Sequence, residues 1–131
     1  MRALRHGAVA LCLGAAACAS QIPAALRGYE ILVERGDPQG VEMARAFRER
    51  GFRVRDAVRG GSRPTAALIF FTFREPGPGT APWLHLRLAD TRTGEIVGAA
   101  MIPLDSASDT PRARAAAGVR ALLANPLPTP P

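Results

Sequence analysis

The stretch from residue 83 to residue 102 constrains the fold of this chain more than any other. Its first part, Trp83–Asp90 (WLHLRLAD), alternates leucine with other residues, which is the period of a strand with one buried face. Residues 96–102 form a second, mostly apolar run, and the Asp90–Glu95 segment between them contains Gly94, which can adopt the positive φ of a tight turn. The pattern predicts an antiparallel hairpin. The side chains expected to face the core are Leu84, Leu86 and Leu88.

A strand, a helix and another strand are expected near the start of the domain. Tyr29–Glu34 alternates apolar and polar residues as a strand does. Asp37, followed by proline, is typical of a helix start, and Gly51 is typical of a helix end. A second strand is expected over residues 52–58, and the short loops imply a parallel pair with a right-handed crossover. The residues expected on the buried face of the helix are Val41, Ala44 and Phe47.

An unbroken apolar run, Ala66–Phe73 (AALIFFTF), predicts a central strand that is buried on both faces. It lies between two expected loops, Arg59–Pro64 (RGGSRP) and Glu75–Pro82 (EPGPGTAP). The prolines and glycines of these two segments disfavour strand pairing.

A last helix is expected to begin at Pro111, after Thr110, and residues 125–131 (NPLPTPP) are expected to form a proline-rich tail. The element order β-α-β-β-β-β-α predicts a single α/β (α+β) domain, with a mixed sheet of about five strands and two helices packed on one face. We expect this domain to cover residues 28–124. The apolar stripe of the last helix is expected to contain Ala115, Ala116, Val119, Leu122 and Leu123.

The N-terminus has the layout of a bacterial secretory signal. Arg2 and Arg5 precede an uncharged, mostly apolar segment, residues 8–17, which is too short to span a bilayer stably. We expect residues 1–17 to be a signal peptide and residues 18–27 to be a tether.

Two cleavage readings remain open at the end of this segment. Ala15-Ala16-Ala17-Cys18 resembles the lipobox of bacterial lipoproteins, in which the cysteine thiol is acylated, and it carries alanine where that motif most often has leucine. This reading predicts lipidation at Cys18 by palmitate-like chains and an anchor on the periplasmic face of the outer membrane. The alternative is ordinary cleavage after Ala19, which predicts a soluble periplasmic protein.

The remaining composition supports few catalytic schemes. Cys12 would leave with the signal, so neither an intramolecular disulfide nor a cysteine-based zinc site is expected. His85 is the one histidine after the signal, and we expect it to lie on the outer face of its strand rather than to act as a catalytic base. The acidic residues are scattered without a close pair. We therefore expect no catalytic, cofactor-binding or metal-binding residues.

All 17 basic residues are arginine, and several gather at the end of the first helix and in the next strand. Export would separate this cluster from nucleic acid, so a solvated face or a contact with anionic lipid headgroups is expected, and no nucleic-acid partner. The clustered residues are Arg45, Arg48, Arg50, Arg53 and Arg55.

Two segments carry a resemblance to a known group of proteins. They are Ala44–Val54 (ARAFRERGFRV), a helix that leaves through glycine into a strand, and Leu84–Val97 (LHLRLADTRTGEIV), with its D-x-x-T-G-E turn. Together they resemble the α/β domain of bacterial envelope lipoproteins, such as the curli secretion lipoprotein and the flagellar outer-membrane assembly lipoproteins. The resemblance covers about Tyr29 to Leu123 and departs from the family at Thr65–Ala67, where an acidic start is usual. Pore formation is not implied, because this chain lacks the length for membrane hairpins.

The sequence favours a non-enzymatic, periplasm-facing lipoprotein that acts as an envelope assembly or interaction module with a protein partner. The alternative is a periplasmic domain that binds or converts a small ligand, with the Glu75–Pro82 and Arg59–Arg63 loops as pocket edges. A cytoplasmic nucleic-acid binder would follow only if the N-terminus is not a signal. A deep pocket rimmed by His85 and arginines would favour the ligand-binding domain, and a flat sheet face or an unpaired strand edge would favour the interaction module.

Overall fold

The computed structural model describes residues 22–58, 60 and 62–124, so the expected signal segment, Cys18 and the proline-rich tail lie outside the described residues. Its strands form a single five-stranded sheet in the order β2-β1-β3-β4-β5. The elements are η1 (Ala24–Leu26), β1 (Glu30–Leu32), α1 (Pro38–Glu49), β2 (Val54–Arg55), β3 (Thr65–Phe73), β4 (Trp83–Asp90), β5 (Ile96–Pro103), η2 (Ser106–Ser108) and α2 (Pro111–Ala124).

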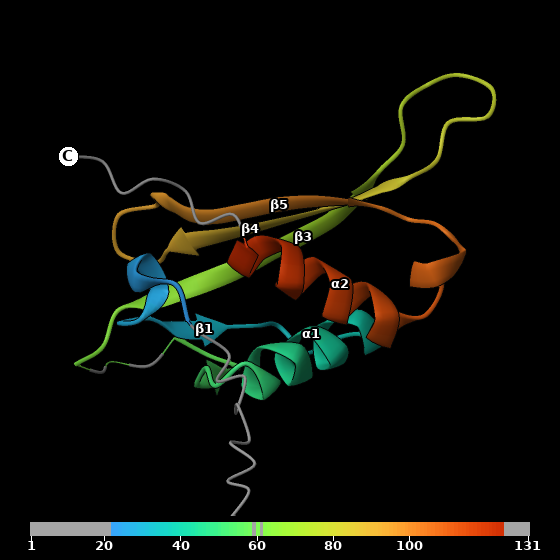
Figure 1. Cartoon of the computed structure of the whole chain (residues 1–131). Coiled ribbons are helices and arrows are strands. Elements are labelled where there is room, and N and C mark those ends of the chain that lie inside the picture. Colours follow the sequence, from blue (N-terminus) through green and yellow to red (C-terminus); the bar gives the residue numbers. More distant parts are fainter. Residues whose placement is uncertain (1–21, 59, 61, 125–131) are drawn as a thin grey trace, which may run out of the picture.

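The sheet contains both parallel and antiparallel strand pairs, as the lengths of the loops between the strands predict. β1 pairs in parallel with β2 and with β3, whereas β3, β4 and β5 form an antiparallel meander. Both helices lie on the same face of the sheet (Figure 1). The predicted fold class and element order are therefore confirmed.

Local signals set the ends of α1. The Asp37 carboxylate accepts a hydrogen bond from the Gly40 backbone N–H at 2.7 Å, and proline occupies the first helical turn. The chain leaves the helix through Gly51, which has a φ of 90°. The prediction that Val41 is buried is wrong, because the helix turns its Gly40, Met43 and Phe47 side inward and leaves Val41 43% exposed.

The core lies between the helices and one face of the sheet. Leu84, Leu86 and Leu88 are all buried, which confirms the predicted register of β4. Leu26, inside the segment expected to be a tether, is also fully buried. The largest side chains below 2% exposure are Phe47, Leu26, Ile31, Met43, Leu86, Leu88, Leu122, Val33 and Val119.

The strand β2 is much shorter than the expected 52–58. The backbone carbonyls of Arg53 and Arg55 accept hydrogen bonds from Ile31 and Val33, at 2.8 and 3.0 Å. β1 is the only strand beside β2 within the described residues, and β1 itself ends at Leu32 as the chain turns toward α1. The length of β1 therefore limits the length of β2.

The prediction that Ala66–Phe73 is buried on both faces is wrong. Ala66 and Leu68 are buried against the helices, but Ile69, Phe71 and Phe73 are 48%, 43% and 46% exposed. The reason is architectural: both helices cover one face, so alternate residues of β3 point to an uncovered face.

In α2, the predicted burial of Ala116 is wrong. Gly118 is buried in its place, and a Cβ atom there would lie 2.9 Å from a Leu86 methyl group. The close approach of α2 to β4 at Gly118 turns Ala116 outward and leaves Leu123 half-buried.

Candidate functional site

The sheet face opposite the helices, here called the open face, carries a row of exposed apolar and aromatic side chains. In the register of the meander, Phe71 lies opposite His85, which lies opposite Met101. The rings of Phe71 and His85 stack at a centroid distance of 4.9 Å and an angle of 16°. Phe73 meets the same imidazole edge-on at 6.0 Å. The exposed large apolar residues of this face are Ile69, Phe71, Phe73 and Met101.

Ile69, Phe71 and Phe73 are neighbours on β3, and His85 on β4 lies between Phe71 and Met101, so these side chains are not scattered single residues. Met101 is 55% exposed, and Phe71 and Phe73 are each more than two-fifths exposed. Contiguous apolar surface with a charged border is typical of interaction sites. The open face therefore has the character of a binding surface.

An ion-pair cluster borders the open face at β1 and β2. Glu30 is only 6% exposed, and its carboxylate lies 2.6 Å from Arg55 Nε and 3.7 Å from an Arg53 nitrogen. A buried carboxylate needs such partners, since desolvation alone disfavours its charge. Arg53 and Arg55 belong to the arginine cluster expected from the sequence, but their partner Glu30 was not expected, because the pairing depends on the parallel register of β1 and β2.

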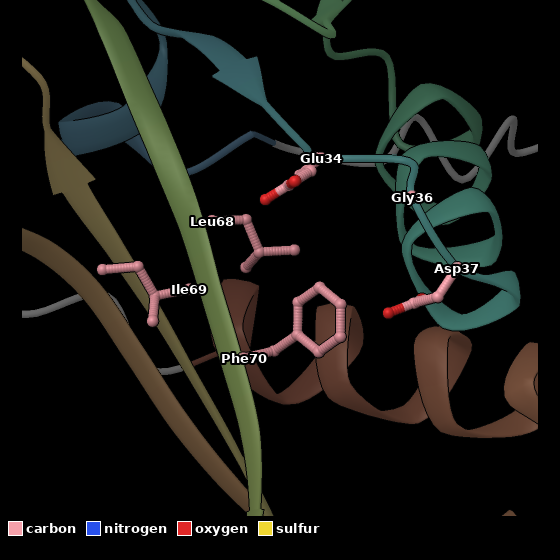
Figure 2. A pocket seen from close by; sticks show the side chains of 6 residues that line it. All are labelled: Glu34, Gly36, Asp37, Leu68, Ile69 and Phe70. Atoms are coloured by element: carbon pink, nitrogen blue, oxygen red, sulfur yellow. The ribbon is translucent and has the colours of Figure 1, made fainter.

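A crevice of about 420 Å³ opens where β1 ends and β3 continues (Figure 2). Leu68 and Phe70 point from β3 into one side, and Asp37 points toward β3 from the start of α1. Asp37 already accepts the helix-capping hydrogen bond from Gly40. The residues that line the crevice are Glu34, Gly36, Asp37, Leu68, Ile69 and Phe70.

A second, open hollow lies beside His85. Its volume is about 350 Å³, and its only ionisable lining groups are His85 and Arg87. The imidazole is stacked against phenylalanine rings, and the lining contains no nucleophile or carboxylate with which it could form a catalytic pair. The ligand-binding hypothesis places two loops, Glu75–Pro82 and Arg59–Arg63, at the edges of a pocket. Neither this hollow nor the crevice is lined by the Glu75–Pro82 loop or by the described part of the Arg59–Arg63 loop.

A partly buried polar contact joins Tyr29, just before β1, to the end of β4. The Tyr29 hydroxyl donates to Asp90 Oδ2 at 2.7 Å, and the Arg92 backbone N–H donates to Asp90 Oδ1 at 2.8 Å. These donors, the Arg92 N–H first, hold the pKa of Asp90 below its ordinary value. Burial, followed by the hydrogen bond to Asp90, raises the pKa of Tyr29. The predicted turn residue Asp90 therefore also ties strands together.

Among residues 22–58, 60 and 62–124, no three histidine, cysteine, aspartate or glutamate side chains gather as a metal site would require. None of the helices in this part of the chain is long and apolar enough to cross a membrane. Comparisons with protein-family models, curated proteins and solved structures give no match for this chain. The resemblance to curli and flagellar lipoproteins stays a prediction from the sequence motifs.

Proposed function

We propose that this chain is a non-enzymatic, lipid-anchored module of the bacterial envelope whose open face binds a protein partner. The observation that carries the proposal is the row of exposed Ile69, Phe71, Phe73 and Met101 on one uncovered sheet face. Complete burial of an exposed side chain of this kind supplies about 1.5 to 3 kcal/mol, and a partner would bury the roughly half of each side chain that is still exposed, which favours binding there. The ion-pair cluster gives the face a polar border at β1 and β2, and Arg87 adds a charge within the face, opposite Ile69.

The proposed lipid anchor lies near the N-terminus of the chain. The expected signal peptide ends just before Cys18, and Ile22 already packs against the core. Even a fully extended chain spans only about 13 to 14 Å between these two residues. Acylation of Cys18 would hold the domain close to the membrane surface, where an envelope partner could reach the open face.

Several ionisable side chains already take part in structural contacts, and this supports a non-enzymatic role. Asp37 caps a helix, Asp90 receives two hydrogen bonds, and Glu30 is paired with arginine. His85 contributes its ring to the aromatic row. Each of these groups has a structural role that accounts for its position.

Complementation of a deletion strain tests the role of the open face. Phe71→Arg places a charge in the centre of the face, and Val41→Arg places the same charge on α1 at the same 43% exposure. We expect Phe71→Arg to fail to restore envelope integrity and Val41→Arg to restore it, at equal protein levels. His85→Phe keeps a ring for stacking and should also restore it. Restoration by Phe71→Arg would contradict the proposal, and failure of His85→Phe would point to imidazole chemistry.

The crevice supports a second candidate function, the binding of a small ligand. Its apolar wall at Phe70 and its Glu34 carboxylate would suit a ligand with an apolar body and a cationic group. Glu34 is exposed, so Glu34→Gln should not disturb the fold. If Glu34→Gln abolishes complementation and Phe71→Arg does not, the ligand-binding function replaces the first proposal.

A further inference from the structure

The outer edge of β5 is an unpaired strand edge. Within the described residues β5 pairs with β4 only and forms one border of the sheet, while β2 forms the other. The β2 border is two residues long and carries arginine, and short, charged edges are a common protection against strand pairing. β5 runs for eight residues (IVGAAMIP) without a charged side chain. Only the β5 edge is long and unprotected.

The hydrogen-bond alternation shows which backbone groups of β5 point outward. The Leu104 N–H donates to the Pro82 carbonyl at 2.8 Å, so this pair is of the hydrogen-bonded kind. In an antiparallel ladder, hydrogen-bonded and non-hydrogen-bonded residue pairs alternate. The next hydrogen-bonded pairs are therefore Ile102 with Leu84 and Ala100 with Leu86. The N–H and C=O groups of Ala99 and Met101 must then point away from β4. They form a template for another strand.

Two features delimit this template. Pro103 has no N–H to donate, and the register shift opposite Leu88 and Ala89 interrupts the ladder at the other end. The segment available for regular pairing therefore runs from Gly98 to Ile102.

The side chains of the Gly98–Ile102 segment are complementary in size to those of the same segment in a second, antiparallel copy of the chain. With Ala100 on a two-fold axis, Ala99 lies opposite Met101 of the second copy, and Gly98 lies opposite Ile102 of the second copy. Each large residue thus meets a small one, and the outward N–H and C=O groups of Ala99 and Met101 form about four hydrogen bonds across the axis. This matching favours a second copy over an unrelated strand as the occupant.

A strand pair of this length is smaller than the roughly 1,200 to 2,000 Å² that stable interfaces bury, so a second layer of contact is needed. An apolar hollow of about 420 Å³ lies between the end of β5 and the outer side of α2. In each copy, α2 lies on one face of the sheet that contains β5 (Figure 1). A second copy paired at the β5 edge would therefore place its own α2 beside this hollow. The lining includes Ile102, Pro103, Ala113, Ala116, Ala117 and Arg120.

We infer that two copies of this chain form a symmetric dimer by antiparallel pairing of β5, with the α2 helices side by side over the joined sheet. The dimer joins two open faces into one surface of doubled width. The dimer edge shares Met101 with the open face, but the dimer and the proposed partner can be tested separately, because Phe71 lies on β3, two strands away from the β5 edge.

Sedimentation of the full-length protein, extracted in a mild detergent, tests the dimer. Wild type should sediment as a dimer. Met101→Arg puts a charge at the edge, at a side chain already 55% exposed, and should give a monomer. Ala99→Pro removes one outward N–H and should also give a monomer, whereas the matched control Phe71→Arg should stay dimeric. Unchanged far-ultraviolet circular dichroism confirms folding, and Met101→Arg decides the outcome if Ala99→Pro does not fold.

A cross-link tests the register. Across a two-fold axis through Ala100, the Cα atoms of a non-hydrogen-bonded pair lie about 4.5 Å apart, within the range that a disulfide spans. Under a mild oxidant, Ala100→Cys should give a disulfide between the two peptides that contain residue 100, identified by mass. A monomeric wild type, a dimer that persists in Met101→Arg, a monomeric Phe71→Arg or a dimer without this cross-link would each overturn the inference.

Discussion

The Tyr29 hydroxyl donates a hydrogen bond to Asp90 Oδ2 at 2.7 Å, although the two residues are 61 positions apart in the chain. Between β1, which follows Tyr29, and β4, which ends at Asp90, lies β3, whose Ala66 pairs with Ile31 on one side and with Asp90 on the other. Ala66 is small and fully buried. The contact links the parallel half of the sheet to the antiparallel half.

This contact predicts a pH-dependent contribution to stability. Because the fold lowers the pKa of Asp90, its ionised form stabilises the protein above about pH 4, the ordinary pKa of aspartate, and this gain is lost as the pH falls through the lowered pKa. Tyr29→Phe removes one of the donors and should cost about 1 to 2 kcal/mol in the free energy of unfolding at neutral pH. Urea unfolding at neutral and acidic pH should show a smaller cost in acid.

Asp90→Asn is the control, because it removes the charge but retains an acceptor. Its unfolding free energy should lose the acid-dependent part seen in wild type. A cost of Tyr29→Phe that is equal at both pH values would contradict the role given to the Asp90 charge.

Gly40 should not tolerate a side chain. A Cβ atom there would lie 2.2 Å from the Glu34 carbonyl oxygen, which is backbone and cannot move aside easily. Gly40→Ala should therefore lower the thermal unfolding temperature and cost about 1 to 3 kcal/mol or more, despite the higher helix propensity of alanine. Gly36→Ala is the matched control, since no atom lies within 4 Å of its Cβ position. Equal stability of the two variants would show that the start of α1 lies farther from residue 34.

Leu86 and Arg87 test the register of β4. Leu86 is fully buried and touches Gly118, whereas Arg87 is exposed on the open face. Leu86→Ala should cost about 2 to 5 kcal/mol through lost burial and a cavity, and Arg87→Ala should change stability by less than about 0.5 kcal/mol. Denaturant unfolding measures both, and similar small effects would be inconsistent with this register.

Cys18 should control the location of the protein. If the thiol is acylated, several acyl chains hold the protein on the membrane, and Cys18→Ser should move it to the soluble periplasmic fraction. The mass of the N-terminal peptide checks the modification directly. A soluble wild type that begins at Ser20 would establish ordinary signal cleavage instead.

Local signals in the sequence predicted much of the fold. Asp37 and Gly51 mark the ends of α1 through capping and a positive φ, and both effects depend only on neighbouring residues. The alternation of β4 and Gly94, with its φ of 73°, likewise predicted the hairpin.

The candidate site was less predictable because it depends on which elements cover the sheet. The run Ala66–Phe73 is apolar at nearly every position, so its composition cannot show that Phe71 faces an uncovered side. Glu30 with Arg55 and Tyr29 with Asp90 pair across strands, and such pairs follow from register and not from local sequence. The size matching in β5 is visible in the sequence only once β5 is known to be an edge strand.

The most direct test of the proposed function is site-specific photo-cross-linking in living cells. A photoreactive amino acid is placed at Phe71 on the open face or at Val41 on α1, two positions of equal 43% exposure. We expect a discrete adduct with one envelope protein from position 71 and no such adduct from position 41. The absence of an adduct at position 71, or the same adducts from both positions, would contradict the open face as the partner-binding surface.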